Sequence, residues 1–176
     1  MRMRAVIESI EGEYRRYRSL GERTMDQLDA AQLVARPSEE SNSIATLAWH
    51  ISGNLESRFT DFFTTDGEKP WRERDDELSV REATPEEIRA KWDRGWAVLM
   101  DTLASLNDDD LKRTVTIRGV EFTVAEALLR SVAHTASHVG QIQYQGKVLA
   151  GGDWEWLSIP PGGTATYNQS PDRERA

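Results

Sequence analysis

Two of the three histidines in this 176-residue chain, His134 and His138, are four positions apart. Residues i and i+4 of an α-helix project from one face, one turn apart, so two such imidazoles can bind the same metal ion. The third histidine, His50, lies in a separate segment with helical apolar spacing. If the two helices pack together, three neutral nitrogen ligands converge and leave coordination positions open. That arrangement is typical of a reactive metal site rather than a structural one.

The residues around the histidines exclude two well-known kinds of metal site. The zinc protease motif His-Glu-x-x-His has a glutamate directly after the first histidine, and Thr135 stands there. Di-iron bundles need Glu-x-x-His motifs, but Leu47, Ser131 and Thr135 precede the three histidines by three residues. Imidazole ligands favour a single divalent ion, Zn²⁺ or Ni²⁺. The alternative is that each histidine is a hydrogen-bonded core residue without a metal.

Other polar residues share the helix faces of the histidines, at helical spacings from them: Asn54, Ser57, Arg130 and Gln141. These side chains can bind a substrate, orient the ligands or hold water. The alternative interpretation is the ordinary polarity of a helical bundle.

Helical periodicity dominates the elements that must position these residues. Apolar side chains at three- and four-residue steps predict long helices over residues 3–33, 44–64, 85–106 and 124–149. Ser43 is a candidate N-cap, and Thr84 and Thr123 each begin a capping-box pattern with a glutamate three residues later. Before the last helix, two alternating segments flank Arg118-Gly119 and predict a small β-hairpin.

These elements predict an all-α fold, a four-helix bundle. The connection between the second and third helices, residues 64–84, is long enough to run the length of the bundle. Those two helices are then parallel, and the bundle has an up-down-down-up order. We expect a single domain over residues 1–168 and a frayed polar tail over residues 169–176.

Composition limits the classes of partner. A formal net charge of −8 makes the chain a poor candidate for nucleic-acid binding. The sequence contains neither a membrane span nor the apolar segment of a signal peptide. The absence of cysteine excludes disulfides, thiolate ligands and a cysteine nucleophile, and it fits a reducing compartment. We therefore expect a cytoplasmic protein without nucleic-acid or membrane partners.

Three longer motifs resemble a known family. Residues 134–142 read His-x-x-x-His-Val-Gly-Gln-Ile, residues 67–75 read Gly-Glu-Lys-Pro-Trp-Arg-Glu-Arg-Asp, and residues 152–160 read Gly-Asp-Trp-x-x-Leu-Ser-Ile-Pro. Together with a single histidine on the second helix, this set resembles the DinB/YfiT-like superfamily over residues 3–168, and in particular its uncharacterised DinB-like branch.

The resemblance implies an up-down-down-up four-helix bundle that is often a homodimer. It also implies a metal site formed by His50, His134 and His138. Some members of the superfamily are transferases that use the thiols bacillithiol or mycothiol, and others are described as metal-dependent hydrolases. For this branch the resemblance does not supply a reaction.

The predicted crossover contains Trp71, Arg72 and Arg74, for which there are two interpretations. Arginines over one mouth of the bundle can bind a carboxylate or a phosphate. In the interpretation that we favour from the sequence, Trp71 instead plugs the end of the bundle, and the two arginines form ion pairs with helix termini.

Three functional hypotheses follow from the sequence. In the first, the protein is an enzyme whose metal ion activates water for hydrolysis or stabilises an external low-molecular-weight thiolate for transfer. In the second, it is a non-catalytic protein that binds a metal or a small ligand, with a role in stress. In the third, it is a structural bundle whose histidines hold no ion. No general base is evident in the sequence.

Overall fold

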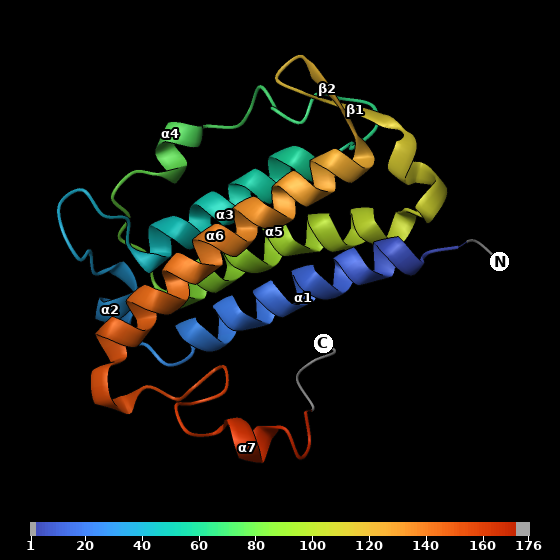
Figure 1. The fold of residues 1–176 in the computed structure, drawn as a ribbon. Coiled ribbons are helices and arrows are strands. Elements are labelled where there is room, and N and C mark those ends of the chain that lie inside the picture. The colour runs from blue at the N-terminus through green and yellow to red at the C-terminus, as the bar shows by residue number, and fades with distance from the viewer. Residues whose placement is uncertain (1–2, 172–176) are drawn as a thin grey trace.

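The computed structural model describes residues 3–171, so the last five residues of the predicted tail lie outside the described part. The described chain is mostly helical, as predicted (Figure 1). Its α-helices are α1 (Ala5–Met25), α2 (Ala30–Val34), α3 (Ile44–Phe59), α4 (Arg74–Glu77), α5 (Pro85–Ser105), α6 (Val124–Ala150) and α7 (Thr164–Tyr167). Strands β1 (Thr114–Ile117) and β2 (Val120–Thr123) form the predicted hairpin, and the 3₁₀ segments are η1 (Asp108–Lys112) and η2 (Gly151–Asp153). Within residues 3–171, no helix is both long and apolar enough to cross a bilayer.

The side-chain caps predicted from the sequence mark the beginnings of three long helices. Ser43 accepts a hydrogen bond from a backbone N–H in the first turn of α3. At α5, Thr84 accepts from the Glu87 N–H at 3.2 Å, and the Glu87 carboxylate accepts from the Thr84 N–H at 2.8 Å. Thr123 and Glu126 form the same reciprocal pair at α6. Each cap satisfies backbone donors that have no partner inside the helix.

The prediction of one continuous helix over residues 3–33 is wrong. Helix α1 ends at Met25, and α2 begins after Asp29. Asp29 and Gln32 form a capping box, with side-chain to backbone hydrogen bonds of 2.8 and 2.9 Å. This local cap starts a new helix although the apolar spacing continues through the break.

The second predicted helix also ends early, at Phe59 rather than near residue 64. Asp61 has a φ of 48°, outside the helical range, and its carbonyl accepts hydrogen bonds from the N–H groups of Thr64 and Thr65. The turn directs the chain away from the axis of α3 and into the long connection that leads to α5.

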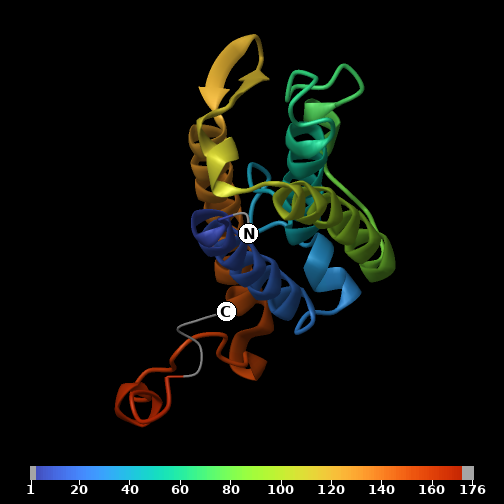
Figure 2. The same cartoon turned by 90° about the vertical axis from the view of Figure 1, so that its right-hand side faces the viewer.

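Four long helices enclose the core, with α3 packed mainly against α5 and α1 against α6 (Figures 1 and 2). The largest fully buried side chains are Trp92 and Trp96 of α5. Trp96 meets Tyr14 of α1 edge to face, with ring centroids 6.2 Å apart. Burial of such aromatic rings is among the largest single contributions to a core. Packing also places α3 against α6, the two helices that carry the histidines.

The connection between α3 and α5 is fastened to the hairpin. The Asp66 carboxylate accepts hydrogen bonds from the backbone N–H groups of Arg118 and Gly119, both at 2.8 Å. Gly67 adds a backbone hydrogen bond to the Thr116 carbonyl at 2.7 Å. Arg118 and Gly119 have positive φ values of 55° and 74°, as a two-residue hairpin turn of the I′ type requires. These hydrogen bonds therefore hold the connection and the hairpin together, beside the C-terminal end of α3 and the N-terminal end of α6.

Substitution of Gly95 tests how closely α5 approaches α3. A Cβ at position 95 would lie 2.6 Å from the Ser52 Cα and 2.8 Å from its carbonyl oxygen, which are backbone atoms that cannot rotate away. We expect Gly95→Ala to lower the free energy of unfolding by about 1–3 kcal/mol, the usual range for overpacking.

Gly140→Ala is the matched control, because a Cβ there would have no heavy atom within 4 Å. Relief of glycine's conformational entropy in a helix should raise stability by up to about 1 kcal/mol. Urea unfolding of both metal-free variants measures the difference. Equal effects would contradict the close approach of the two helices.

Candidate metal centre

The three histidines meet between α3 and α6. His50 projects from α3, and His134 and His138 project from successive turns of α6. The Nε2 atom of His134 is 3.3 Å from Nε2 of His50 and 3.2 Å from Nε2 of His138. One ligand atom from each ring lies within 4.8 Å of the other two. The structure thus brings together the residues whose convergence was expected from the sequence.

Outer hydrogen bonds fix which nitrogen two of the rings present. Nδ1 of His50 is 3.0 Å from Oε2 of Glu77, and Nδ1 of His138 is 3.0 Å from Oε1 of Gln141. A carboxylate and an amide oxygen only accept hydrogen bonds, so each Nδ1 must carry the proton. In the neutral rings, Nε2 is then unprotonated, and its lone pair faces the centre of the cluster. This is the usual way in which a protein orients histidine ligands.

The cluster has too few protons to satisfy itself through hydrogen bonds. Neutral His134 can supply one N–H to the centre, yet its Nε2 faces two lone pairs, those of His50 and His138. At least one contact must then place lone pairs against each other. A shared cation removes that repulsion. Tetrahedral ligands at the usual Zn–N distance lie about 3.3 Å apart, close to the separations of His134 from His50 and from His138, and the third pair lies within 4.8 Å. The donor set therefore fits a single divalent ion.

The protein environment favours the neutral form of His134 and His138. Burial, followed by the nearby charges of the other histidines and of Arg72 and Arg58, lowers the pKa of His134 to about 4. Burial also lowers the pKa of His138, although its hydrogen bond to Gln141 acts in the opposite direction. Neutral imidazole is the form that binds a metal, so both rings are ready for ligation at neutral pH.

Glu77, which the sequence did not single out, is the buried partner of His50. Its carboxylate forms two hydrogen bonds of 2.8 Å with Arg72, whose side chain is 2% exposed. Burial alone would raise the pKa of Glu77, but the hydrogen bonds from Arg72 and His50 outweigh it and hold that pKa below its usual value. A Cβ on Gly53, three residues after His50, would overlap the carboxylate, so only glycine leaves room for it.

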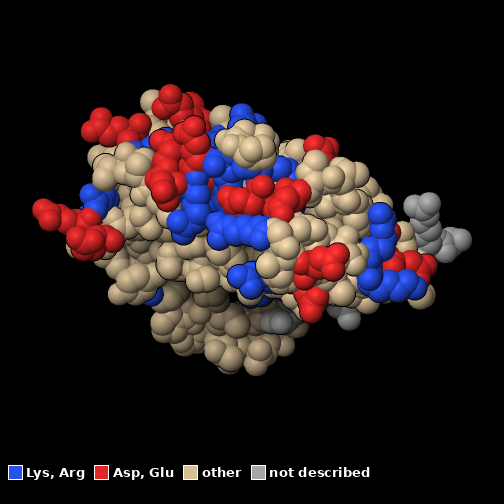
Figure 3. All heavy atoms as spheres, turned by 90° about the horizontal axis from the view of Figure 1, so that it is seen from above, with Lys and Arg blue, Asp and Glu red and all other residues tan. Residues whose placement is uncertain are grey.

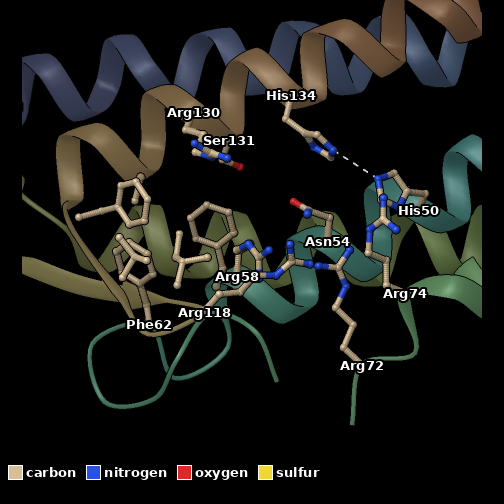
Figure 4. Close-up of a pocket in the computed structure, with 15 residues that line it drawn as sticks. His50, Asn54, Arg58, Phe62, Arg72, Arg74, Arg118, Arg130, Ser131 and His134 are labelled. Atoms are coloured by element: carbon tan, nitrogen blue, oxygen red, sulfur yellow. Dashed lines mark hydrogen bonds between the residues drawn. The ribbon is translucent and has the colours of Figure 1, made fainter. Parts of the chain in front are cut away.

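A cavity of about 460 Å³ opens beside the histidines, and His50 and His134 form part of its wall (Figure 4). Asn54 and Arg130, both expected to face a pocket, line it. Two other expected pocket residues have different positions. Ser57 is buried and donates to the Gly67 carbonyl at 2.7 Å, and Gln141 holds His138. The sequence thus predicted two wall residues, and Gln141 orients a candidate ligand, which is another of the expected roles, whereas Ser57 binds the connection.

The arginines of the connection contribute to this cavity, and the interpretation favoured from the sequence is wrong for the tryptophan. Trp71 does not plug the bundle, because it is 53% exposed. Arg72 does form ion pairs, with the carboxylates of Glu68 and of Glu77, the last residue of α4. Arg72 and Arg74 both line the cavity. Figure 3 shows basic and acidic side chains interleaved on the upper face of the molecule.

The fold and the site define a helical protein with a cluster of three histidines, one buried and two partly buried, beside an arginine-lined cavity. The chain belongs to the family described as "protein of unknown function (DUF1572)", which it matches over residues 3–163. No curated protein is similar to the chain at the level required for a match. The match includes all three histidines and Glu77, and it does not name the wider superfamily that the motifs resemble.

Substitution of Glu77 tests its role in orienting His50. Glu77→Gln removes the negative charge that faces the Nδ1 proton of His50, and it leaves the buried Arg72 side chain with only the longer ion pair to Glu68. We expect the affinity for Zn²⁺ to fall by about 10–100-fold, the usual effect of a lost outer partner. Competition with a chromophoric zinc chelator measures the affinity, with circular dichroism as the check of folding.

Glu56→Gln is the matched control, because Glu56 is a buried α3 carboxylate that pairs with Lys91 and Arg94 instead. This variant should unfold more easily and bind Zn²⁺ with unchanged affinity. An equal loss of affinity in both variants would mean that Glu77 acts only through stability.

The lowered pKa of His134 predicts that acid weakens the metal-free fold. An unfolded histidine has a pKa near 6.5, so between that value and about 4 the unfolded chain binds more protons than the folded one. The stability of the folded protein is therefore unaffected by this titration above about pH 6.5, and it decreases as the pH falls toward 4. From pH 7 to pH 5 we expect a loss of about 1 kcal/mol, after a discount for the partly exposed ring. Urea unfolding at both pH values should show a smaller loss in His134→Gln, and an identical loss would contradict the assignment.

Proposed function

We propose that this protein is a metal-dependent enzyme that acts on a small molecule, either as a hydrolase or as an S-transferase for a low-molecular-weight thiol. In this proposal His50, His134 and His138 hold one divalent ion, Zn²⁺ or Ni²⁺. The observation that carries the proposal is the convergence of three imidazole nitrogens, two of them from rings in the wall of a cavity large enough for a small organic substrate.

The chemistry of the donor set supports a reactive centre. Three neutral ligands leave the full charge of the ion uncompensated, and such an ion lowers the pKa of water or of a thiol that reaches it. Glu77 and Gln141 keep two of the rings oriented. The chain contains no cysteine, so a thiol would have to come from outside the protein.

A second function is a non-catalytic protein that binds a metal or a small ligand, with a role in stress. The observation that favours it is the lining of the cavity, which within the described residues contains no aspartate or glutamate. A carboxylate in contact with a substrate is the commonest general base besides histidine, and the wall histidines are the proposed ligands.

We also propose membership of the DinB/YfiT-like superfamily, an up-down-down-up four-helix bundle and a homodimer. Support for the topology comes from the course of the chain in Figure 1, where α1 and α6 run in one direction and α3 and α5 in the other. The long connection across α3 is consistent with this order. The superfamily and the homodimer rest on the sequence motifs and on what they imply.

Metal content is the first test of the proposal. The protein is purified without an affinity tag and then incubated with Zn²⁺ or Ni²⁺. Elemental analysis by inductively coupled plasma mass spectrometry should find about one ion per chain, because three ligands suffice for a site with open positions. His134→Ala should weaken metal binding by more than about a hundredfold, which is a larger loss than removal of a residue that only hydrogen-bonds to a ligand would cause. Ser137→Ala, an exposed neighbour on α6, is the control that should keep the ion. A metal content near zero in the wild-type protein would overturn the site.

A substrate screen distinguishes the two functions. Esters, amides and thiol-transfer substrates with an added low-molecular-weight thiol should reveal an activity that His134→Ala abolishes and Ser137→Ala retains. Activity that survives in His134→Ala would not belong to the histidine cluster. A metal-loaded wild-type protein that is inactive throughout the screen would favour the non-catalytic function.

A further inference from the structure

The wall of the cavity has an unusual charge composition. No acidic residue of the described part of the chain lines it. Five arginines do: Arg58, Arg72, Arg74, Arg118 and Arg130. The whole chain, by contrast, has a formal net charge of −8. The wall of this site is therefore positive in a chain whose overall charge is negative, and a low-dielectric cleft strengthens the field of these arginines.

Two of these arginines are already engaged in holding the structure. Arg72 is buried and pairs with Glu77 and Glu68. Arg58 donates to the Gly67 carbonyl at 2.5 Å and to Glu68 at 3.0 Å. Burial lowers the pKa of Arg58 and nearby arginines lower it further, although Glu68 opposes both effects. The positive charges thus lie close enough together to repel one another.

Glu68 is too widely shared to neutralise the arginines of the cavity. It contacts Arg118 at 3.1 Å in addition to Arg58 and Arg72, so one carboxylate serves three guanidinium groups. Within residues 3–171, the only carboxylate paired with Arg74 is the fully exposed Asp75, at 3.7 Å.

Arg130 is the least engaged of the five arginines. In the described part of the chain it has no ion pair, and its guanidinium lies 5.8 Å from the centre of the Phe122 ring. In Figure 4, Arg130 projects from α6 on one side of the cavity and Arg74 lies on the other side, near His50. The two arginines can therefore reach a ligand from opposite walls.

The remainder of the wall is largely apolar. Aromatic and aliphatic side chains from the end of α3, the start of the connection and the hairpin line it: Phe59, Phe62, Ile117, Val120 and Phe122. Asn54 places an amide between these residues and the histidines (Figure 4). The cavity thus combines positive charge, an apolar surface and the candidate metal centre.

We propose that the cavity binds a small organic anion, whose carboxylate or phosphate group pairs with Arg74 and Arg130 while its apolar part packs against the phenylalanines. A guanidinium donates two parallel hydrogen bonds to such an oxyanion, which gives orientation as well as affinity. As the substrate class of the enzyme this inference rests on the proposed function, whereas the binding of the anion itself does not require a metal.

The test is calorimetric titration of phenylacetate, phenyl phosphate and the neutral analogue phenylacetamide into protein freed of metal by chelator and dialysis. We expect at least one anion to bind and phenylacetamide to bind much more weakly, and the stronger anion shows whether a carboxylate or a phosphate is preferred. Added salt should weaken the binding, because it screens partly exposed charges. Equal binding of the anion and the amide, or no binding of either anion at millimolar concentration, would overturn the proposal.

Variants assign the binding to the two arginines. Arg130→Gln and Arg74→Gln should each weaken anion binding about tenfold, as for a lost hydrogen bond to a charged group. Arg23→Gln is the matched control, because Arg23 is an exposed arginine of α1 that does not line this cavity. Unchanged affinity in both cavity variants, or binding that appears only after metal is added, would overturn the assignment. A protein that holds no metal but binds the anion through Arg130 would refute the proposed function and support this inference.

Discussion

The buried hydrogen bonds of Glu77 are the interaction on which the site depends. This one carboxylate joins α4 to α3 through His50 and holds Arg72 in the wall of the cavity. It therefore determines the tautomer of a candidate ligand and the position of a positive charge at the same time. Without it, His50 would lose the partner that directs its Nε2 atom toward α6, and the buried Arg72 side chain would keep only its longer ion pair with Glu68, at 3.4 Å, which is destabilising.

The hydrogen bonds of this buried charge cluster fix its geometry closely. Removal of a carboxylate and a guanidinium from water costs several kcal/mol for each ion, and their mutual attraction repays this cost only when the hydrogen bonding is nearly complete. Here Arg72 binds both oxygens of Glu77, and one of these oxygens also accepts from His50. Nearly every orientation of the three groups except the observed one would leave a buried donor or acceptor unsatisfied.

Local signals explain what could be predicted from the sequence. Helix beginnings at Thr84 and Thr123 depend on side chains a few residues apart, and the four-residue spacing of His134 and His138 places both on one face whatever the rest of the fold does. The break before α2 was missed because an apolar stripe continues through it, although the capping pair of Asp29 and Gln32 is just as local. There the cap outweighed the periodicity.

Contacts created by the path of the connection could not be predicted in the same way. No spacing rule relates position 77 to position 50, and their meeting depends on where the connection crosses α3. For the same reason Ser57 was expected to face a pocket, although the connection covers it and takes its hydrogen bonds. Helical spacing identifies the face on which a residue lies, but it does not show what will cover that face.

The division of the site between two kinds of element has a further consequence. All three histidines come from the long helices of the core, whereas four of the five arginines in the cavity lie outside those helices or at the end of α3, where the connection and the hairpin meet it. Core positions tolerate little change in shape, while connections accept substitutions and insertions readily. Relatives with the same long helices can therefore keep the histidine cluster unchanged and differ in the charge and outline of the cavity wall.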